Sequence, residues 1–441
     1  MKRISLFILN FMFLLLTTNA NTCNVSGDVG TYVVNQTWVI EFTYPPSNDT
    51  TLTFHVYIPQ DNPPYQQVLN ITSNYNYSFI YDEFGNRMVN FTFTPKDERI
   101  VIWLTSIVKT NYTVPVGEGI IGNGYNYSSN LTEYDEGMIS LVHNITHDRT
   151  DLTSLAQLLE WVNTNIEYDY RYQETNLPAE EVFRVKRGTC DEYSILYLSF
   201  LRMLGVRGRL IYGLVYSDDL WQKHAWVEYE SDGRWYPADP SFLQMNHLSS
   251  THIMLGKAGD PLQFHEYLSV RTRDPSLDYR LTGKVNITIL NSSCEKKPII
   301  TSKTEQQEDT LRLSITFTNP YDHTLIDTFS INYPKSLTLL QGDDQELIVI
   351  PPRGNITKTL TFSTPRVEPG YIYSFSYTVN TLCAEHTGSF EFGNNQTYLL
   401  QTPKTDSPLK HIDIRIMVVI LLIVIVYLSS ASLTPFIGDK R

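Results

Sequence analysis

Apolar and polar residues alternate along the first part of the chain in short runs. Examples are TWVIEFTY from Thr37, TLTFHVYI from Thr51 and RIVIWLTSIV from Arg99. Period-two alternation is typical of strands that bury one face, and turn-forming residues such as those at 45–49 separate the runs. We therefore expect an N-terminal antiparallel β domain over residues 21–134.

The period becomes helical after residue 135. Apolar residues recur every three or four positions over 151–166, and Asp151 precedes them as a suitable N-cap. Residues 190–204 are apolar nearly all round, which indicates a helix buried in a core, and Gly205 is a typical residue at a helix C-terminus. Shorter helices are expected at 136–143 and 179–185.

Strand patterns follow the buried helix at 209–216, 225–229 and 234–236, with a hairpin turn at 231–233. A helix packed on an antiparallel sheet is an α+β arrangement, and we assign it to a catalytic domain over residues 135–284.

Strand patterns return every eight to twelve residues from 285 to 400, separated by Pro- and Gly-containing turns. That spacing is typical of an immunoglobulin-like β-sandwich, although the tryptophan of antibody domains is missing from the pattern. The predicted fold class is thus α+β, with the catalytic core between an N-terminal β domain and a C-terminal β-sandwich.

Both ends of the chain are strongly apolar. Residues 1–20 combine a basic start, an apolar run and small residues before a cleavage point after Ala20, as a signal peptide does. Near the other end, 18 uncharged residues at 416–433 are long enough to span a membrane. We expect a linker at 401–411, a transmembrane helix at 412–433 and a cytoplasmic tail at 434–441. This layout places the rest of the chain at the cell surface.

Glycosylation acceptors agree with an extracellular location. The chain has fourteen Asn-x-Ser/Thr triplets, against about five expected from its composition. A Thr- and Asn-rich β surface is the alternative source of part of this excess. The acceptor positions are Asn24, Asn35, Asn48, Asn70, Asn76, Asn90, Asn111, Asn126, Asn130, Asn144, Asn286, Asn291, Asn355 and Asn395.

Composition and charge narrow the function. The 441 residues, 42% hydrophobic and 18% charged, suit several globular domains. A formal net charge of -13 without a Lys/Arg patch argues against nucleic acid as a partner. Four cysteines are too few for a disulfide scaffold. Cys294 and Cys383 are candidates for one bridge, and Cys190 has no obvious partner.

Three residues in chain order carry candidate chemistry. Cys190 is at the head of the buried helix, His224 lies in a strand-like run, and Asp239 follows a short hairpin. A helix N-terminus favours a thiolate, a histidine can take its proton, and an aspartate can orient the imidazole. The Cys190 backbone N–H is a candidate oxyanion donor, and the second donor is not identifiable from the pattern.

Each of these residues also has a purely structural interpretation. A cysteine at a helix start commonly packs, a strand histidine is commonly structural, and an aspartate before proline commonly forms a turn. Trp226 and Trp235 can line a cleft or fill a core, and we favour the core for Trp226. A metal site built on His247, His252 and His265 is a weak third possibility, because their spacing fits no usual set of ligands.

The blocks around Cys190, His224 and Asp239 resemble the transglutaminase-like core of the papain-like cysteine-enzyme superfamily. The resemblance covers about residues 136–245 and is carried by RGTCDEYSILYLSFLRMLG, VRGRLIYG, HAWVE and GRWYPADPS. It implies that Cys190 is the nucleophile, His224 the base and acid, and Asp239 the orienting carboxylate. The compact layout is similar to membrane-anchored prokaryotic, including archaeal, members.

The resemblance leaves the acyl acceptor open. Members of the family share an acyl-enzyme and include hydrolases, protein cross-linking enzymes and amidases that remove glycans from asparagine. The leading hypothesis is a cell-surface thiol hydrolase of peptide or isopeptide amides in proteins, peptides or cell-envelope material. The alternatives are a protein-glutamine transglutaminase and an inactive surface adhesion or envelope-organising protein. No acidic cluster indicates calcium, so no cofactor is expected.

Overall fold

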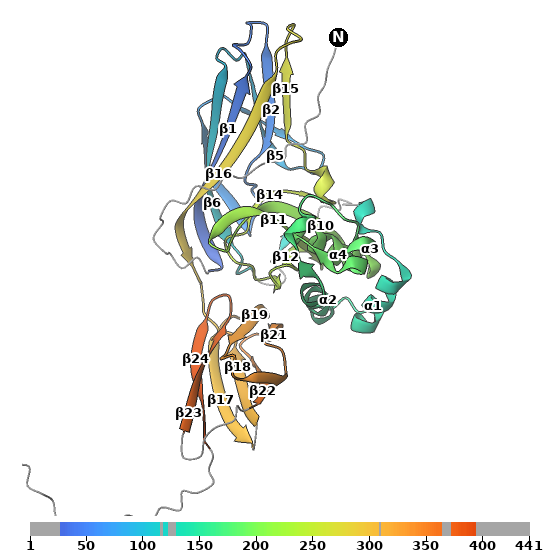
Figure 1. Cartoon of the computed structure of the whole chain (residues 1–441), viewed down its shortest axis with the longest axis vertical. Coiled ribbons are helices and arrows are strands. Elements are labelled where there is room, and N and C mark those ends of the chain that lie inside the picture. Colours follow the sequence, from blue (N-terminus) through green and yellow to red (C-terminus); the bar gives the residue numbers. More distant parts are fainter. Residues whose placement is uncertain (1–26, 115–117, 122–128, 308–309, 364–371, 394–441) are drawn as a thin grey trace, which may run out of the picture. The chain divides into compact units, whose positions relative to one another are not determined.

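The structure is a computed structural model that describes residues 27–114, 118–121, 129–307, 310–363 and 372–393. The predicted signal peptide, linker, membrane span and tail, together with Cys23, lie outside these residues. Within the described ranges, no helix is both long enough and apolar enough to cross a membrane. The described fold is mostly β, with a few helices gathered in the middle of the sequence (Figure 1).

Two four-stranded antiparallel sheets form around the N-terminal strands, in the orders β16-β1-β6-β3 and β15-β2-β5-β4. Alternate residues of β1 are buried, as the period-two pattern predicts. The inward faces of the two sheets meet in a core that includes Trp38, Phe54 and Ile102. The strands are β1 (Val29–Phe42), β2 (Thr51–Tyr57), β3 (Gln66–Ser73), β4 (Ser78–Tyr81), β5 (Arg87–Phe93), β6 (Arg99–Asn111), β15 (Tyr267–Arg271) and β16 (Tyr279–Ser293).

The border predicted at 284/285, between the central domain and the C-terminal β-sandwich, does not separate two sheets. β16 crosses it and pairs antiparallel with β1 along almost its whole length, and β15 pairs with β2. The segment KVNITIL from Lys284, predicted to open the C-terminal domain, thus completes the N-terminal sheets. β16 buries only one face against its neighbours, so its alternating pattern fits either sheet equally well.

The predicted helix-on-sheet core is present at the centre of the sequence. Its sheet has the order β13-β12-β11-β10-β14, and β7 pairs with β12. Helix α4 (Cys190–Met203) packs on β10 and β11, and its Leu196, Leu198 and Phe200 share one buried cluster with Val227. The strands are β7 (Ile120–Ile121), β10 (Gly208–Ser217), β11 (Leu220–Ser231), β12 (Arg234–Asp239), β13 (Gln244–Met245) and β14 (Ile253–Ala258).

The helices of the core begin close to where the sequence predicts them. Asp151 caps α2 by accepting a hydrogen bond from the Ser154 N–H at 2.9 Å. Gly205 follows α4 in the left-handed region (φ +71°), where a residue without Cβ is favoured. The helices are α1 (Glu136–Thr146), α2 (Leu152–Asn165), α3 (Ala179–Val185) and α4 (Cys190–Met203), and the short parallel pair is β8 (Glu167–Tyr168) with β9 (Arg187–Gly188).

Residues 299–393 form two further four-stranded sheets, β17-β18-β22-β20 and β21-β19-β23-β24. Phe317, Phe329, Phe362 and Phe390 belong to one buried cluster that draws on both sheets. The assignment to an immunoglobulin-like sandwich stays a prediction. The strands are β17 (Ile299–Gln307), β18 (Thr310–Thr318), β19 (Leu325–Asn332), β20 (Thr338–Gln341), β21 (Gln345–Ile350), β22 (Asn355–Ser363), β23 (Ile372–Asn380) and β24 (Glu385–Gly393).

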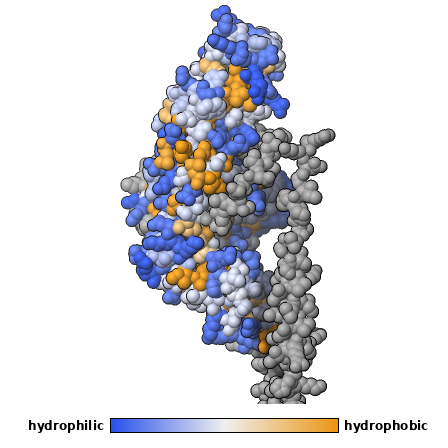
Figure 2. Space-filling model, turned by 90° about the vertical axis from the view of Figure 1, so that its left-hand side faces the viewer, coloured by the Kyte–Doolittle hydropathy of each residue, from blue (hydrophilic) through white to orange (hydrophobic). Residues whose placement is uncertain are grey.

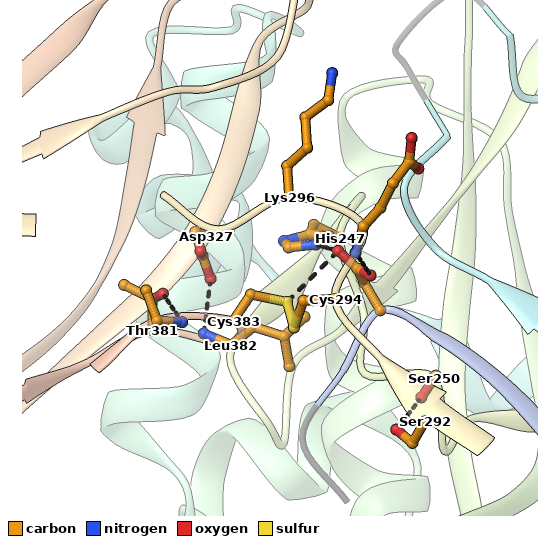
Figure 3. Close-up of a disulfide and its surroundings, with 12 residues drawn as sticks. His247, Ser250, Ser292, Cys294, Lys296, Asp327, Thr381, Leu382 and Cys383 are labelled. Carbon is orange, nitrogen blue, oxygen red and sulfur yellow. Dashed lines mark hydrogen bonds and ion pairs between the residues drawn. A yellow bond between two sulfur atoms is a disulfide. The ribbon is translucent and has the colours of Figure 1, made fainter. Parts of the chain in front are cut away.

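A disulfide joins Cys294, just after β16, to Cys383, between β23 and β24 (Figure 3). The candidate bridge is therefore present, and Cys190 is a free thiol, as the candidate chemistry requires. On the face drawn in Figure 2, hydrophobic residues form small patches separated by hydrophilic ones. Scattered patches of this kind are normal for a protein surface.

Candidate active site

The start of α4 is built to hold Cys190 at a helix N-terminus. Cys190 is the first residue of the helix, and Glu192 in the first turn accepts hydrogen bonds from the Thr189 N–H and hydroxyl, both at 2.8 Å. A Cβ on Gly188 would lie 2.3 Å from the Glu192 Cβ, so any larger residue at position 188 would clash with the Glu192 side chain. The predicted placement of the thiol is confirmed.

The core sheet brings His224 and Asp239 together. His224 lies in β11, and Asp239 is the last residue of the neighbouring antiparallel strand β12. His224 Nε2 and Asp239 Oδ2 are 2.6 Å apart, and both residues are buried. The Cys190 thiol lies beside His224 and helps to raise the pKa of its imidazole. Because Nε2 is engaged by Asp239, Nδ1 is the ring nitrogen that remains for the thiol.

The Asp239 carboxylate is surrounded by donors. Oδ1 accepts hydrogen bonds from the Ser241 N–H (2.9 Å), the Ser241 hydroxyl (2.7 Å) and the Phe242 N–H (3.0 Å). Oδ2 lies 2.6 Å from His224 Nε2 and 3.0 Å from His252 Nε2. Such a set fixes the carboxylate in one orientation and stabilises its charged form.

Electrostatics favour an imidazolium at His224. Burial opposes the charged ring, but the Asp239 carboxylate and the Cys190 thiol outweigh burial and raise the pKa of His224 to about 10. Burial likewise opposes the Asp239 carboxylate, yet His224 and His252 hold its pKa far below the usual range. This histidine stands beside the partly exposed Cys190 at the N-terminus of α4, where it can exchange a proton with a nucleophile.

Further ionisable side chains lie near the candidate site. Asp191, the neighbour of Cys190, is partly buried, and desolvation and the Glu192 charge raise its pKa to about 7. Desolvation also raises the pKa of Glu266 to about 7 and lowers the pKa of Lys223, the residue before His224. The charges of Asp191 and Glu266 therefore change near neutral pH.

His252 is a second histidine on Asp239, and the sequence analysis considered it only as a metal ligand. It is fully buried just before β14, and burial lowers its pKa and favours the neutral ring. His252 Nε2 lies 3.0 Å from Asp239 Oδ2, and Nδ1 lies 3.0 Å from both the Ser249 hydroxyl, which can donate to it, and the Ser249 carbonyl oxygen, which can only accept. His252 thus orients the carboxylate that orients His224.

We expect His252→Leu to lower the free energy of unfolding by about 1–3 kcal/mol, because Asp239 loses a buried hydrogen-bond donor. His252→Gln keeps an amide N–H that can point at Oδ2 and should recover part of the loss. Denaturant unfolding of the two variants beside the parent chain measures this. Equal stability of the Leu and Gln variants would show that the donor at this position is unimportant.

The proposed three-histidine metal set does not come together. His247 Nε2 lies 3.1 Å from Asp28, His252 binds Asp239, and His265 is exposed. His224, Asp239 and His252 do place three ligand atoms within 4.8 Å of one another. However, two tetrahedral ligands of Zn²⁺ stand about 3.3 Å apart, given Zn–N bonds of about 2.0–2.1 Å. The 2.6 Å contact is a hydrogen bond and is too short for two ligands of one ion.

Aromatic rings enclose the histidines. Phe242 stacks on His224 with ring centroids 4.8 Å apart, and Trp226 stands edge-on to His252 at 5.1 Å. Trp226 and Trp235 are each 1% exposed, so both belong to the core, as favoured for Trp226. Trp226 nevertheless contributes to the site, because it packs against the buried imidazoles of His224 and His252 and limits their rotation.

The structure places His252, which the sequence suggested only as a metal ligand, beside Asp239, and it places Tyr168, which the sequence did not single out, opposite Gly188. Burial and the neighbouring Cys190 raise the pKa of Tyr168. His252 stands just before a strand that pairs with β10, and Tyr168 stands in a stretch with several other tyrosines. Neither position has a residue pattern that sets it apart, so pairing in three dimensions was needed to find them.

Comparison with known proteins gives one family match. The model of the transglutaminase-like superfamily matches residues 139–240, which include Cys190, His224 and Asp239. No curated protein sequence matches the chain.

Solved structures resemble the chain only loosely. A protein from Cytophaga hutchinsonii, named as a putative cysteine protease, is 13% identical with a TM-score of 0.43, over 60% of this chain and 93% of that one. A protein from Parabacteroides distasonis, named as a putative protease, is 9% identical with a TM-score of 0.21, over 74% of this chain and 69% of that one.

Proposed function

The chain contains a domain of the transglutaminase-like superfamily, and on that premise we propose that it is a cell-surface thiol enzyme. Cys190 forms an acyl-enzyme, and the enzyme hydrolyses peptide or isopeptide amide bonds in protein, peptide or cell-envelope material. The observation that carries the proposal is the meeting of a free thiol at a helix N-terminus with a buried histidine whose other nitrogen is held by a carboxylate at 2.6 Å.

Each residue has one role in the proposed reaction. The Cys190 sulfur attacks the amide carbonyl carbon, a C–S bond forms, and the carbonyl electron pair moves to the oxygen. His224 gives its proton to the leaving amine as the C–N bond breaks. Water then attacks the thioester, His224 takes a proton from it, and the C–S bond breaks to release the carboxylic acid. Asp239 holds the ring in place throughout.

Water is taken as the acyl acceptor because the compact layout of the core resembles that of hydrolases in the superfamily. A lysine amine as acceptor would instead produce an isopeptide cross-link. Both reactions share the acyl-enzyme, so the residues of the triad do not separate them.

The cell-surface location is supported by two features of the described residues. Eleven of the fourteen glycosylation acceptors lie among them, and none of these eleven asparagines is buried. A disulfide joins Cys294 to Cys383, and such bonds persist in oxidising compartments. These two features and the apolar run at 416–433 support a chain that is anchored by a C-terminal membrane helix. The proposed immunoglobulin-like sandwich precedes that helix in the sequence.

Amine incorporation separates hydrolysis from cross-linking. The purified chain is incubated with a glutamine-containing protein and a labelled primary amine, with Cys190→Ala as the control. We expect hydrolysis products that depend on Cys190 and no labelled protein, because water is the acceptor. Label incorporated by the parent chain and absent with Cys190→Ala would overturn the assignment as a hydrolase.

A further inference from the structure

Four side chains of the kinds that bind transition metals meet at the disulfide, away from the triad (Figure 3). Asp28 precedes β1, His247 follows β13, Cys294 follows β16, and Cys383 lies between β23 and β24. Ligand atoms of Asp28, Cys294 and Cys383 all lie within 4.8 Å of one another. His247 Nε2 lies 3.1 Å from Asp28 Oδ2. Thiolate, imidazole and carboxylate groups are the protein ligands of Zn²⁺.

Asp28 is held so that one carboxylate oxygen faces this group. The residue is fully buried, and its Oδ1 accepts a hydrogen bond from the Glu295 N–H at 3.0 Å. Oδ2 lies 3.3 Å from the Tyr321 hydroxyl, 3.1 Å from His247 Nε2 and 3.5 Å from the Cys383 sulfur. The hydroxyl and imidazole contacts are longer than the most frequent hydrogen-bond distances, about 2.7–3.0 Å. Its present partners therefore bind Oδ2 only weakly.

The disulfide matches this oxygen poorly. A sulfur within a disulfide has no hydrogen, so Cys383 cannot donate to the buried Asp28 carboxylate while the bond is present. After reduction, a cation between the sulfur and the oxygen would attract both of them. Cys294 is partly exposed, so a reductant in solution can reach the bond. The same four side chains thus have a second possible state, in which they surround a metal ion.

The distances from Oδ2 suit the ligands of one ion. With Zn–N and Zn–O bonds of about 2.0–2.1 Å, two tetrahedral ligands stand about 3.3 Å apart. A sulfur bonded at about 2.3 Å stands about 3.5 Å from such an oxygen. The observed 3.1 Å to His247 Nε2 and 3.5 Å to the Cys383 sulfur are close to these values. The 2.6 Å contact between His224 and Asp239 is not.

We propose that the two cysteines of the disulfide, once reduced, bind Zn²⁺ together with Asp28 and His247. A dithiol reductant gives two electrons and two protons, forms its own disulfide, and leaves two thiols in place of the bond between Cys294 and Cys383. Zn²⁺ then displaces the protons of the two thiols and of His247 Nε2, and these protons pass to water. The disulfide is the form for an oxidising compartment, and the zinc site is the form for a reducing one.

Metal binding is measured on the full-length chain carrying Cys190→Ala, so that the candidate nucleophile cannot bind the ion. One sample keeps its disulfide, and another is reduced with dithiothreitol and freed of the reductant under nitrogen. Zn²⁺ alone is titrated in competition with a coloured chelator. Co²⁺ alone reports bound thiolates through the charge-transfer absorption between sulfur and cobalt.

Two variants each remove one proposed ligand. His247→Gln keeps a hydrogen-bond donor for Asp28 but loses the imidazole, and Cys294→Ser loses one sulfur. His323→Ala is the matched control, because His323 stands beside Tyr321, with ring centroids 5.0 Å apart, but is not one of the four proposed ligands. Thermal unfolding verifies that each chain is folded.

We expect the reduced chain to bind one Zn²⁺ ion, to show thiolate–cobalt absorption and to gain in Tm when Zn²⁺ is added, whereas the oxidised chain does none of these. His247→Gln and Cys294→Ser should each weaken binding about 100-fold or more, and His323→Ala should change it less than about threefold. A reduced chain that binds no Zn²⁺, folded or unfolded, overturns the inference. Binding that is equal in the oxidised chain, or in both ligand variants and the control, also overturns it.

Discussion

Replacing Cys190 by alanine should lower amide and ester hydrolysis by about 10⁴-fold or more, because no other group can form the acyl-enzyme. The fold should survive the change. Alanine favours a helix start no less than cysteine does, and the thiol is only partly buried. Hydrolysis of a peptide library, followed by mass spectrometry, measures the loss.

Cys190→Ser is the matched variant for this prediction. Its hydroxyl has nearly the shape of the thiol but is a much weaker nucleophile, so hydrolysis should fall here too. Hydrolysis that persists in the folded alanine variant would contradict the assignment of Cys190 as nucleophile. Hydrolysis that is absent from the parent chain, together with alkylation of Cys190 no faster than in a denatured control, would favour the inactive adhesion protein.

Asp239→Asn should lower kcat by about 10³-fold or more while the fold is retained. An asparagine has one oxygen, whereas both carboxylate oxygens of Asp239 face donors. If the oxygen stays with the Ser241 and Phe242 N–H groups, the NH₂ faces His224 Nε2 and favours the wrong tautomer. The rate of turnover against substrate concentration, with KM little changed, measures this effect.

The same variant should alter the pH dependence of stability. The pKa of His224 is raised in the folded chain, so its contribution is complete below about 6.5 and is lost as pH rises through about 10. The pKa of Asp239 is lowered, so its contribution is present above about 3.8 and is lost in acid. Parent and Asp239→Asn should therefore differ most near pH 5–6 and less near pH 10.

Denaturant unfolding at pH 6 and pH 10 tests this, and Asp327→Asn is the control. Asp327 is also buried, at 2% exposed, but burial raises its pKa and it makes no hydrogen bond to the triad. Its replacement should leave hydrolysis unchanged. A stability difference for Asp239→Asn that grows toward pH 10 would contradict the ion pair.

Local patterns in the sequence predicted the parts of the fold that local physics determines. The cap at Asp151, the start of α4 at Cys190 and the glycine after it depend on neighbours a few residues away. Strands β10, β11 and β12 were also recognisable, because alternation and a turn at 231–233 mark a hairpin. The meeting of His224 and Asp239 follows from that hairpin.

The alternation of apolar and polar residues could not predict which strands pair when they are distant in the sequence. β16 returns to β1 across more than two hundred residues, and its alternation does not record which strand it joins. His252 reaches Asp239 because β14 pairs with β10, and Tyr168 lies opposite Gly188 because β8 pairs with β9. A residue type and its neighbours cannot reveal such contacts when the partner strand is unknown.

Cys190 should carry the acyl group during turnover. The parent chain is mixed with an acyl donor ester, quenched in acid within the first turnover, digested, and its peptides are weighed by mass spectrometry. We predict one acyl group on the peptide that contains Cys190 and none in Cys190→Ala. An acyl group on another residue, or none on a Cys190 thiol that iodoacetamide still alkylates, would contradict the account.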